Sequence, residues 1–449
     1  MRSWAARASI WPLICAFPGY CLTFIWGNWL NSPACFQSLS ADIAANRAGL
    51  PSIVTAKNYW EARTVCLDPY WQNQWLKHYD FGLVKRGFLG AFLKVFTGDE
   101  INVLVLNLLF PLIGFLLIFA LIFTVREVSL LRGKALAVFA VLLSVSPFTK
   151  VIVETSGDPL HVVALLCFFA IFLGLRLPSS QVRLRPLLHI AVYIVALLIY
   201  EGSYLLLLPF LFFDRKIDLA RVVCLAASTV LLIGFSRPES AEIGVNIAGS
   251  LTMFNPANGL SWAYQAGGGV SPNVGFMFNA KQEFARYLDQ PTGYIFRAFR
   301  SFVPSISVGL IFGSFMRFRS RDSAISLFRE ASFIFIFGIP FFLITHDYFR
   351  YWMFVICIAI FVVYERFAPS RAEANQRSMP MPLETVRGTN DWICFVPLVA
   401  FVLVGPFAED VRTWFPEHAF FGSLFVLMLA CLGYAWSEFR SQQLDHASP

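Results

Sequence analysis

The stretch NVLVLNLLFPLIGFLLIFALIFT, residues 102–124, contains no charged side chain. An α-helix rises about 1.5 Å per residue, so this stretch would form a helix of roughly 35 Å, and the hydrocarbon core of a bilayer is about 30 Å thick. Apolar runs of roughly 15 to 25 residues recur along the chain, whereas the alternating strands of a membrane barrel are not seen. The pattern therefore predicts an all-α, polytopic integral membrane protein.

The composition supports this fold class. Of the 449 residues, 57% are hydrophobic and 14% are charged, whereas charged residues make up about a quarter of an ordinary soluble domain. The net charge of +7 comes from basic residues scattered between the apolar runs. Basic residues placed in this way encode membrane topology, so we expect no nucleic-acid partner.

The apolar runs predict about twelve transmembrane helices. The pair around 187–213 could be two short helices or one long kinked helix, because YEGS at 200–203 interrupts it. The first run follows Arg2 and Arg7, and no small-x-small cleavage site ends it, so we expect an uncleaved first helix rather than a signal peptide. The expected helices cover residues 10–30, 102–124, 135–149, 159–175, 187–200, 203–213, 219–235, 301–316, 331–345, 351–364, 393–406 and 419–436.

The basic residues also predict the orientation of these helices. When the N-terminus is placed in the cytoplasm, every short basic loop falls on the cytoplasmic side, and little beyond Lys150, Arg350 and Arg412 falls on the other. We therefore expect a multi-pass protein of the cell (inner) membrane, in contact with membrane lipids, with both termini cytoplasmic. The cytoplasmic loops would contain Arg126, Arg132, Lys134, Arg176, Arg183, Arg185, Arg215, Lys216, Arg221, Arg317, Arg319, Arg321, Arg329, Arg366, Arg371, Arg377 and Arg387.

Three parts of the chain follow from this topology. Residues 1–365 would form a transmembrane core, from which two long loops, 31–101 and 236–300, extend on the extracytoplasmic side. The polar segment 366–392 would be a cytoplasmic linker, and 393–449 would form a C-terminal helix pair and tail. Cys35 and Cys66 share the first long loop and could form a disulfide there, although spacing alone does not establish the bond.

Acidic residues recur where the chain meets the outer membrane boundary. Asp80 lies in the first outer loop, Glu154 and Asp158 lie in VETSGDPLH at the next outer turn, and Glu201 lies in YEGS at the third. Ionisable groups at membrane depth are costly and usually mark a functional site. We therefore interpret Asp80, Asp158 and Glu201 as candidate catalytic residues. The candidate substrate-binding residues are Arg86, Lys85, Arg350, His346, Asp347, Glu154, Trp75 and Tyr79.

Each of these residues also has a structural explanation. Asp80 could cap an amphipathic helix that lies in the membrane interface, and Asp158, which precedes Pro159, could cap the helix that follows. Lys85 and Arg86 could reach lipid phosphates. The aromatic residues of the first loop could form an interfacial belt.

Glycosyl transfer from a lipid-linked donor would use these residues together. The sugar is carried on polyprenyl phosphate or pyrophosphate, so its polar head lies at the membrane interface. An inverting transfer needs a carboxylate to take the proton of the acceptor hydroxyl, and arginine side chains suit the leaving phosphate. We expect Asp80 to be this base, with Asp158 or Glu201 supporting or replacing it, and Arg86 and Arg350 to hold the phosphate. The acceptor would be a glycan or a lipid.

The layout resembles the GT-C class of polytopic glycosyltransferases and is similar to the O-antigen and exopolysaccharide polymerases of bacterial envelopes. The resemblance covers the whole chain as architecture, and it implies a first-loop catalytic acid at Asp80 and a second acidic turn at Glu154 and Asp158. The strings DFGLVKRG (80–87) and HDYFRYW (346–352) also resemble those of membrane proteins from bacterial polysaccharide loci. The chain departs from the GT-C pattern because Asp80 stands farther from the first helix, and the paired acids Asp99 and Glu100 lie at the entry to the second helix.

The sequence leaves other readings open. Asp80, Asp158 and Glu201 would offer oxygen ligands to Mg²⁺ or Mn²⁺, although their spacing requires no metal. A transporter or flippase of envelope precursors would also carry membrane charges, but it would place them near the middle of broken helices. A membrane acyltransferase would use a histidine, either His161 or His346 with Asp347. A non-catalytic envelope assembly protein is the remaining alternative.

Overall fold

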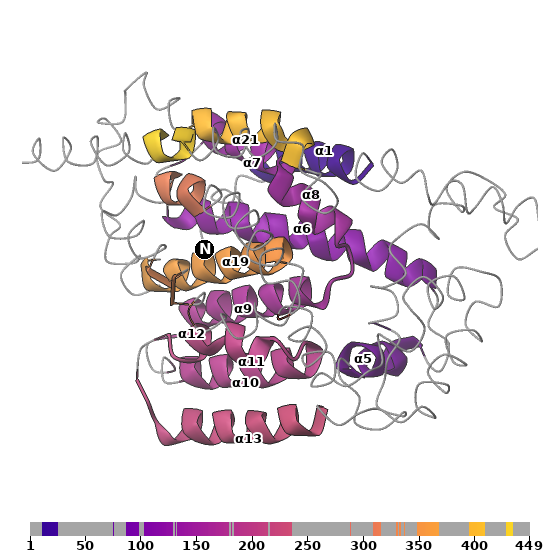
Figure 1. The fold of residues 1–449 in the computed structure, drawn as a ribbon, viewed down its shortest axis with the longest axis vertical. Coiled ribbons are helices and arrows are strands. Elements are labelled where there is room, and N and C mark those ends of the chain that lie inside the picture. Colours follow the sequence, from indigo (N-terminus) through magenta and orange to yellow (C-terminus); the bar gives the residue numbers. More distant parts are fainter. Residues whose placement is uncertain are drawn as a thin grey trace, which may run out of the picture.

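The protein is a bundle of α-helices (Figure 1). The computed structural model describes residues 11–25, 75, 87–97, 103–128, 131, 133–178, 181, 184–213, 216–235, 288, 309–315, 329–330, 332–333, 336, 348–367, 395–408 and 428–433. Within these residues the regular structure is helical and contains no β-strand. The helices are α1 (Trp11–Ile25), α5 (Gly87–Thr97), α6 (Val103–Val128), α7 (Gly133–Ser144), α8 (Pro147–Glu154), α9 (Pro159–Arg176), α10 (Arg185–Ile199), α11 (Ser203–Leu206), α12 (Leu208–Leu211), α13 (Leu219–Phe235), α19 (Tyr348–Phe367) and α21 (Phe395–Ala408).

Two helices among the described residues are long and apolar enough to cross a membrane. They are the 21 residues Leu108–Val128 of α6 and the 18 residues Pro159–Arg176 of α9. Both meet this test by length and composition, which supports the expected membrane protein. The expected count of about twelve spans stays a prediction, because several of the predicted helices fall wholly or partly outside the described residues.

Helix α19 forms the centre of the bundle. It packs against α9 on one side and α6 on the other, and α10 packs on the far side of α9 (Figure 1). Every residue from Val355 to Val363 is at most 4% exposed, so α19 is buried around its whole circumference there. A helix that is apolar on all faces is stable only when other helices or lipid surround it. The ring of Phe168 in α9 lies 5.3 Å from that of Phe361 in α19, within the contact between these two helices.

The bundle has two polar ends. We call one the Asp158 end, where α9 and α19 begin and α10 finishes. We call the other the Glu365 end, where His189 Nε2 lies 3.2 Å from Glu365 Oε1 and both side chains are buried. Arg366 Nη2 donates a hydrogen bond of 2.9 Å to the Phe213 carbonyl at that end. The helix termini that carry Arg126, Arg176 and Arg366 all lie at the Glu365 end, as their predicted loops on one side of the membrane require.

The bounds of several helices agree with the sequence-based prediction, and two of the predicted helices are each broken in two. The helices expected at 159–175 and 219–235 are α9 and α13. The single helix expected over 135–149 is instead two helices, α7 and α8. Pro147 cannot continue a helix because it lacks an N–H, and the hydroxyl of Ser146 caps the new helix by accepting from Thr149 N. The sequence SPF therefore marks a helix start that the hydropathy of the run concealed.

The segment expected as a helix over 203–213 is also broken, into the single turns α11 and α12. It nevertheless runs the length of the bundle, because Tyr200 bonds Tyr351 at one end of α19 and Phe213 bonds Arg366 at the other. The Tyr193 hydroxyl of α10 donates 2.6 Å to the Tyr204 carbonyl and so satisfies a backbone group near the break. Broken backbone is tolerated inside a membrane protein when neighbouring helices supply such partners.

The close approach of α1 and α7 gives a test of the packing. A Cβ added at Gly19 would lie 2.0 Å from Ser144 Oγ, which is far inside contact distance. We expect Gly19→Ala to destabilise the protein by about 1–3 kcal/mol, because two helices in a membrane approach closely only at small residues. The measurement is the thermal unfolding midpoint of the purified protein in detergent.

The matched control is Gly309→Ala in the helical segment 309–315, where an added Cβ meets no described residue within 4 Å. The second change Ser144→Ala should restore part of the stability lost in Gly19→Ala, because it removes the clashing Oγ. Equal midpoints for Gly19→Ala and Gly309→Ala would contradict the packing of α1 on α7.

Candidate functional site

Asp158 caps helix α9 at one end of the bundle. Its Oδ1 accepts a hydrogen bond of 2.9 Å from Leu160 N, and Pro159 occupies the first position of the helix. An aspartate before a proline suits a helix start, since the carboxylate satisfies a free N–H and proline needs none. The capping explanation that the sequence suggested is therefore confirmed. It accounts for only one of the two carboxylate oxygens.

The other oxygen of Asp158 faces Arg350. Arg350 Nη1 lies 3.2 Å from Asp158 Oδ2, so the two side chains form an ion pair between the starts of α9 and α19. Arg350 Nη2 donates a hydrogen bond of 2.6 Å to the Tyr351 hydroxyl. The Tyr351 hydroxyl in turn shares a hydrogen bond with the Tyr200 hydroxyl at the finish of α10. The pair thus belongs to a polar network that joins three helices.

The ion pair is deeply buried. Asp158 is 0% exposed and Arg350 is 8% exposed. Arg350 also lies in the first turn of α19, where the helix dipole opposes a positive charge, and the carboxylate of Asp158 beside it offsets that repulsion. Burying two charges rarely adds net stability compared with apolar residues of similar size. An ionisable pair held at such cost in a membrane bundle is a candidate functional site.

Trp75 closes the turn that precedes Asp158. Its indole N–H donates a hydrogen bond of 2.6 Å to the Gly157 carbonyl, and its ring lies 5.1 Å from that of Phe110. Trp75 is 3% exposed, so its faces are occupied by protein. In this structure Trp75 positions the backbone beside Asp158, and it does not present a free face to a sugar.

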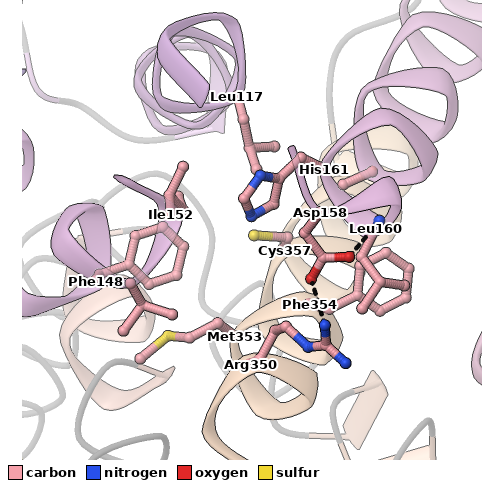
Figure 2. A pocket seen from close by; sticks show the side chains of 12 residues that line it. Leu117, Phe148, Ile152, Asp158, Leu160, His161, Arg350, Met353, Phe354 and Cys357 are labelled. Atoms are coloured by element: carbon pink, nitrogen blue, oxygen red, sulfur yellow. Dashed lines mark hydrogen bonds and ion pairs between the residues drawn. The ribbon is translucent and has the colours of Figure 1, made fainter. Parts of the chain in front are cut away.

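A small cavity lies beside the ion pair, enclosed by α6, α8, α9 and α19 (Figure 2). Its volume is about 20 Å³. A water molecule needs roughly 10–15 Å³ measured in this way, so the cavity accommodates one water or one hydroxyl group. The polar residues on its wall are Asp158, His161 and Arg350, and the rest of the wall is almost entirely apolar. Figure 2 shows the imidazole of His161 between Leu117 and Cys357, on the same side of α9 as Asp158.

The structure connects three of the residues singled out in the sequence, Asp158, Arg350 and Trp75, and places Glu201 next to the same network. Asp158 contacts Arg350, Trp75 contacts the residue before Asp158, and Glu201 follows Tyr200, which bonds Tyr351. Glu201 is itself buried, at 5% exposure. Glu154 ends α8, and its side chain is outside the described part of the structure. Asp80, Tyr79, Lys85, Arg86, His346 and Asp347 lie outside the described residues.

Sequence reasoning did not identify Tyr200, Tyr351 or Gly157. Both tyrosines stand next to a predicted site residue, in YEGS and FRYW, so adjacency was the available signal. Their hydrogen bond depends on how α10 and α19 pack, which no local pattern encodes. Gly157 adopts a φ of +92°, a conformation that glycine adopts readily, and an added Cβ would lie 2.5 Å from Phe110 Cε2.

The residues that the structure describes do not form a metal site. Among the described residues, no three His, Cys, Asp or Glu side chains come together in a way that could hold a metal ion. Because Asp80 is outside the described residues, the divalent metal considered from the sequence stays a prediction.

Comparisons of the chain with protein-family models, with curated proteins and with solved structures found no match. The function must therefore be argued from the site itself.

The buried pair predicts non-additive effects on stability. We expect Asp158→Asn or Arg350→Gln to lower the free energy of unfolding by about 3–5 kcal/mol, because each leaves a buried group without its charged partner. The double variant should lose clearly less than the sum of the two. Thermal or denaturant unfolding of the purified variants measures this.

The control for that cycle is Arg329→Gln. Arg329 Nε lies 3.5 Å from Glu330 Oε1, but the arginine side chain is 54% exposed, so its loss should cost about 0–1 kcal/mol. Strictly additive losses for Asp158 and Arg350 would show that the two side chains do not interact.

Gly157 gives a second test of the site. Gly157→Ala should destabilise the turn before Asp158, because alanine disfavours this φ and its Cβ would strike the Phe110 ring. Gly133→Ala is the matched control, since Gly133 has a φ of +53° with nothing within 4 Å of an added Cβ. The two variants share backbone strain and differ in packing. The unfolding midpoint of Gly157→Ala should be several degrees below that of Gly133→Ala, and equal midpoints would contradict the contact with Phe110.

Proposed function

We propose that this chain is a helical membrane glycosyltransferase or polysaccharide polymerase that moves sugars from polyprenyl-phosphate or polyprenyl-pyrophosphate donors. The observation that carries the proposal is the buried pair of Asp158 and Arg350 at one end of the bundle, where Glu201 follows Tyr200, the hydrogen-bond partner of Tyr351. A carboxylate and a guanidinium side by side are the groups that a phosphate-linked sugar donor needs. The GT-C-like layout of the sequence supports the same chemistry.

Charge supports the membrane placement that we propose for this end. Arg126, Arg176 and Arg366 lie near the Glu365 end, and basic residues favour the cytoplasmic side of a membrane. The Asp158 end then faces the outer side of the cytoplasmic membrane, with about twelve spans and both termini in the cytoplasm, as expected from the sequence. A polyprenyl-linked sugar at that surface keeps its tail in lipid and its phosphate near Arg350.

Arg350 would hold the donor phosphate. Its guanidinium is planar and always charged, so it can bind two phosphate oxygens at once. In the structure it points one nitrogen at Asp158 and another at the Tyr351 hydroxyl. Asp158 and Tyr351 thereby fix the orientation of the fork before the donor arrives, which lowers the entropy cost of binding.

The size of the cavity limits how substrate could bind. A volume of about 20 Å³ admits one hydroxyl group and no sugar ring. The acceptor would therefore place a single hydroxyl beside Arg350, with its ring at the rim of the cavity.

Two broken helices favour a second candidate, a transporter or flippase of envelope precursors. Helices α7 and α8 are separated at Pro147, and α8 lines the cavity with Phe148 and Ile152. Helices α11 and α12 form the second break. Discontinuous helices beside a charged site are typical of secondary transporters. A transporter would move the lipid-linked sugar unchanged, whereas a transferase would produce a new glycosidic bond.

A transfer assay tests the proposed function. Membranes containing the chain are incubated with polyprenyl-linked sugars extracted from the source organism, and new glycosidic products are measured by mass spectrometry. Arg350→Lys should reduce the transfer rate about 10- to 100-fold, because lysine keeps the charge but lacks the planar fork.

The matched control is Arg366→Lys, at the opposite end of the same helix, where the guanidinium pairs with Glu330 at 2.6 Å. That variant should transfer at close to the wild-type rate. If the wild-type chain forms no new glycosidic bond but moves labelled donor across the membrane, the transporter replaces the transferase.

A further inference from the structure

His161 is the third polar residue of the cavity wall. It lies in the first turn of α9, one turn after Asp158, and is 7% exposed. Helical spacing of three residues places the two side chains on one face, and both border the cavity with Arg350 (Figure 2). The ring therefore stands where a bound hydroxyl would meet the charged pair.

One hydrogen bond of His161 indicates its tautomer. Its Nε2 lies 3.4 Å from Thr155 Oγ1. The Thr155 hydroxyl already donates its single proton to the Val151 carbonyl at 2.7 Å, so Oγ1 can only accept from the histidine. A neutral His161 thus carries its proton on Nε2, and Nδ1 holds a lone pair. Nδ1 forms no hydrogen bond with any residue that the structure describes.

Asp158 is less available for proton transfer than its position suggests. Its Oδ1 accepts from Leu160 N, and its Oδ2 faces the Arg350 guanidinium at 3.2 Å. Both oxygens thus face a positive or partly positive group that stabilises the carboxylate in place. The carboxylate orients Arg350, while the Nδ1 lone pair of His161 is buried and uncommitted.

We propose that Nδ1 of His161, rather than a carboxylate, is the atom that accepts the proton of a hydroxyl bound in the cavity. The inference rests on the proposed function, of which it names the base. The ligand class is an alcohol, namely one hydroxyl of the acceptor glycan or lipid. Asp158 then acts as a positioning residue for Arg350.

The step balances without an added reactant. The acceptor hydroxyl gives its proton to His161 Nδ1, and its oxygen forms a bond to the anomeric carbon of the donor sugar. The bond from that carbon to the phosphate oxygen breaks, and its electron pair leaves on the phosphate, beside Arg350. The imidazolium later returns its proton to the departing phosphate or to water.

A buried structural histidine is the competing explanation, and two variants separate it from the base. His161→Gln retains a side-chain N–H that can reach Thr155 but has no basic nitrogen. If His161 is the base, this variant should fold and transfer sugar at least about 100-fold more slowly, the contribution typical of general base catalysis. His189→Gln is the matched control at the Glu365 end, and it should transfer at a rate within a few-fold of the wild type.

The ¹⁵N spectrum of histidine-labelled wild-type protein gives an independent readout. The chain has 6 histidines, and the His161 signals are those absent from His161→Gln or, if that variant does not fold, from His161→Asn. We expect Nε2 to be protonated, and Nδ1 to carry no proton and to shift on binding of an acceptor alcohol. This measurement does not depend on activity.

The outcomes are distinct. Wild-type transfer together with a fully active His161→Gln overturns the proposal while the proposed function stands. A spectrum in which Nδ1 carries the proton also overturns it. If the wild-type chain transfers no sugar, the proposed function fails, and the proposal survives as a hydroxyl-binding site only if Nδ1 is unprotonated and responds to the alcohol. Slow transfer by His161→Gln with the Nε2–H tautomer supports both.

Discussion

The pairing of Asp158 with Arg350 is the constraint on which the polar end of this bundle depends. One carboxylate oxygen starts helix α9, and the other faces a guanidinium that lies against the dipole of α19. The same guanidinium bonds Tyr351, which reaches Tyr200 at the finish of α10. Three helices are thereby held in register at one end by a buried network, while apolar packing around α19 fixes the rest. Buried hydrogen bonds strengthen one another, so this network holds each of its side chains in one orientation.

The function proposed for this end draws on its position as well as its chemistry. The Glu365 end carries its own buried pair, His189 with Glu365, but this pair lies with the basic helix termini. The Asp158 end combines a cation for phosphate, a carboxylate to orient it and an imidazole whose Nδ1 bonds no described residue, around a space of one hydroxyl. This combination favours transfer to an alcohol over simple structural pairing. The broken helices that border it are the feature that keeps transport as the competing function.

The sequence predicts much of the helical architecture and little of the site. The bounds of α9 and α13 follow from apolar runs between polar flanks, and Pro159 marks the start of α9. The break before Pro147 was missed because hydropathy averages over it, although Ser146 and Pro147 form a recognisable helix start. The placement of Asp158 and Glu201 at the same end was predicted, because successive helices run in opposite directions through the bundle. The contact of Asp158 with Arg350 was not, because it depends on the packing of Phe168 against Phe361 between segments far apart in the chain. The Nδ1 lone pair of His161 depends in addition on a hydrogen bond between Thr155 and Val151 and on how the turn before α9 folds back on α8.

The central claim is that the Asp158 end acts on lipid-linked sugars at the outer membrane face. The most direct measurement is the profile of cell-surface polysaccharide and polyprenyl-linked intermediates in a strain that lacks the chain, complemented with the wild type or with Asp158→Asn. The account predicts that the polymer is lost and a polyprenyl-linked sugar accumulates, and that the wild type restores the profile while the variant, although present in the membrane, does not. An unchanged glycan profile in the deletion strain would contradict the account and would favour movement of another solute.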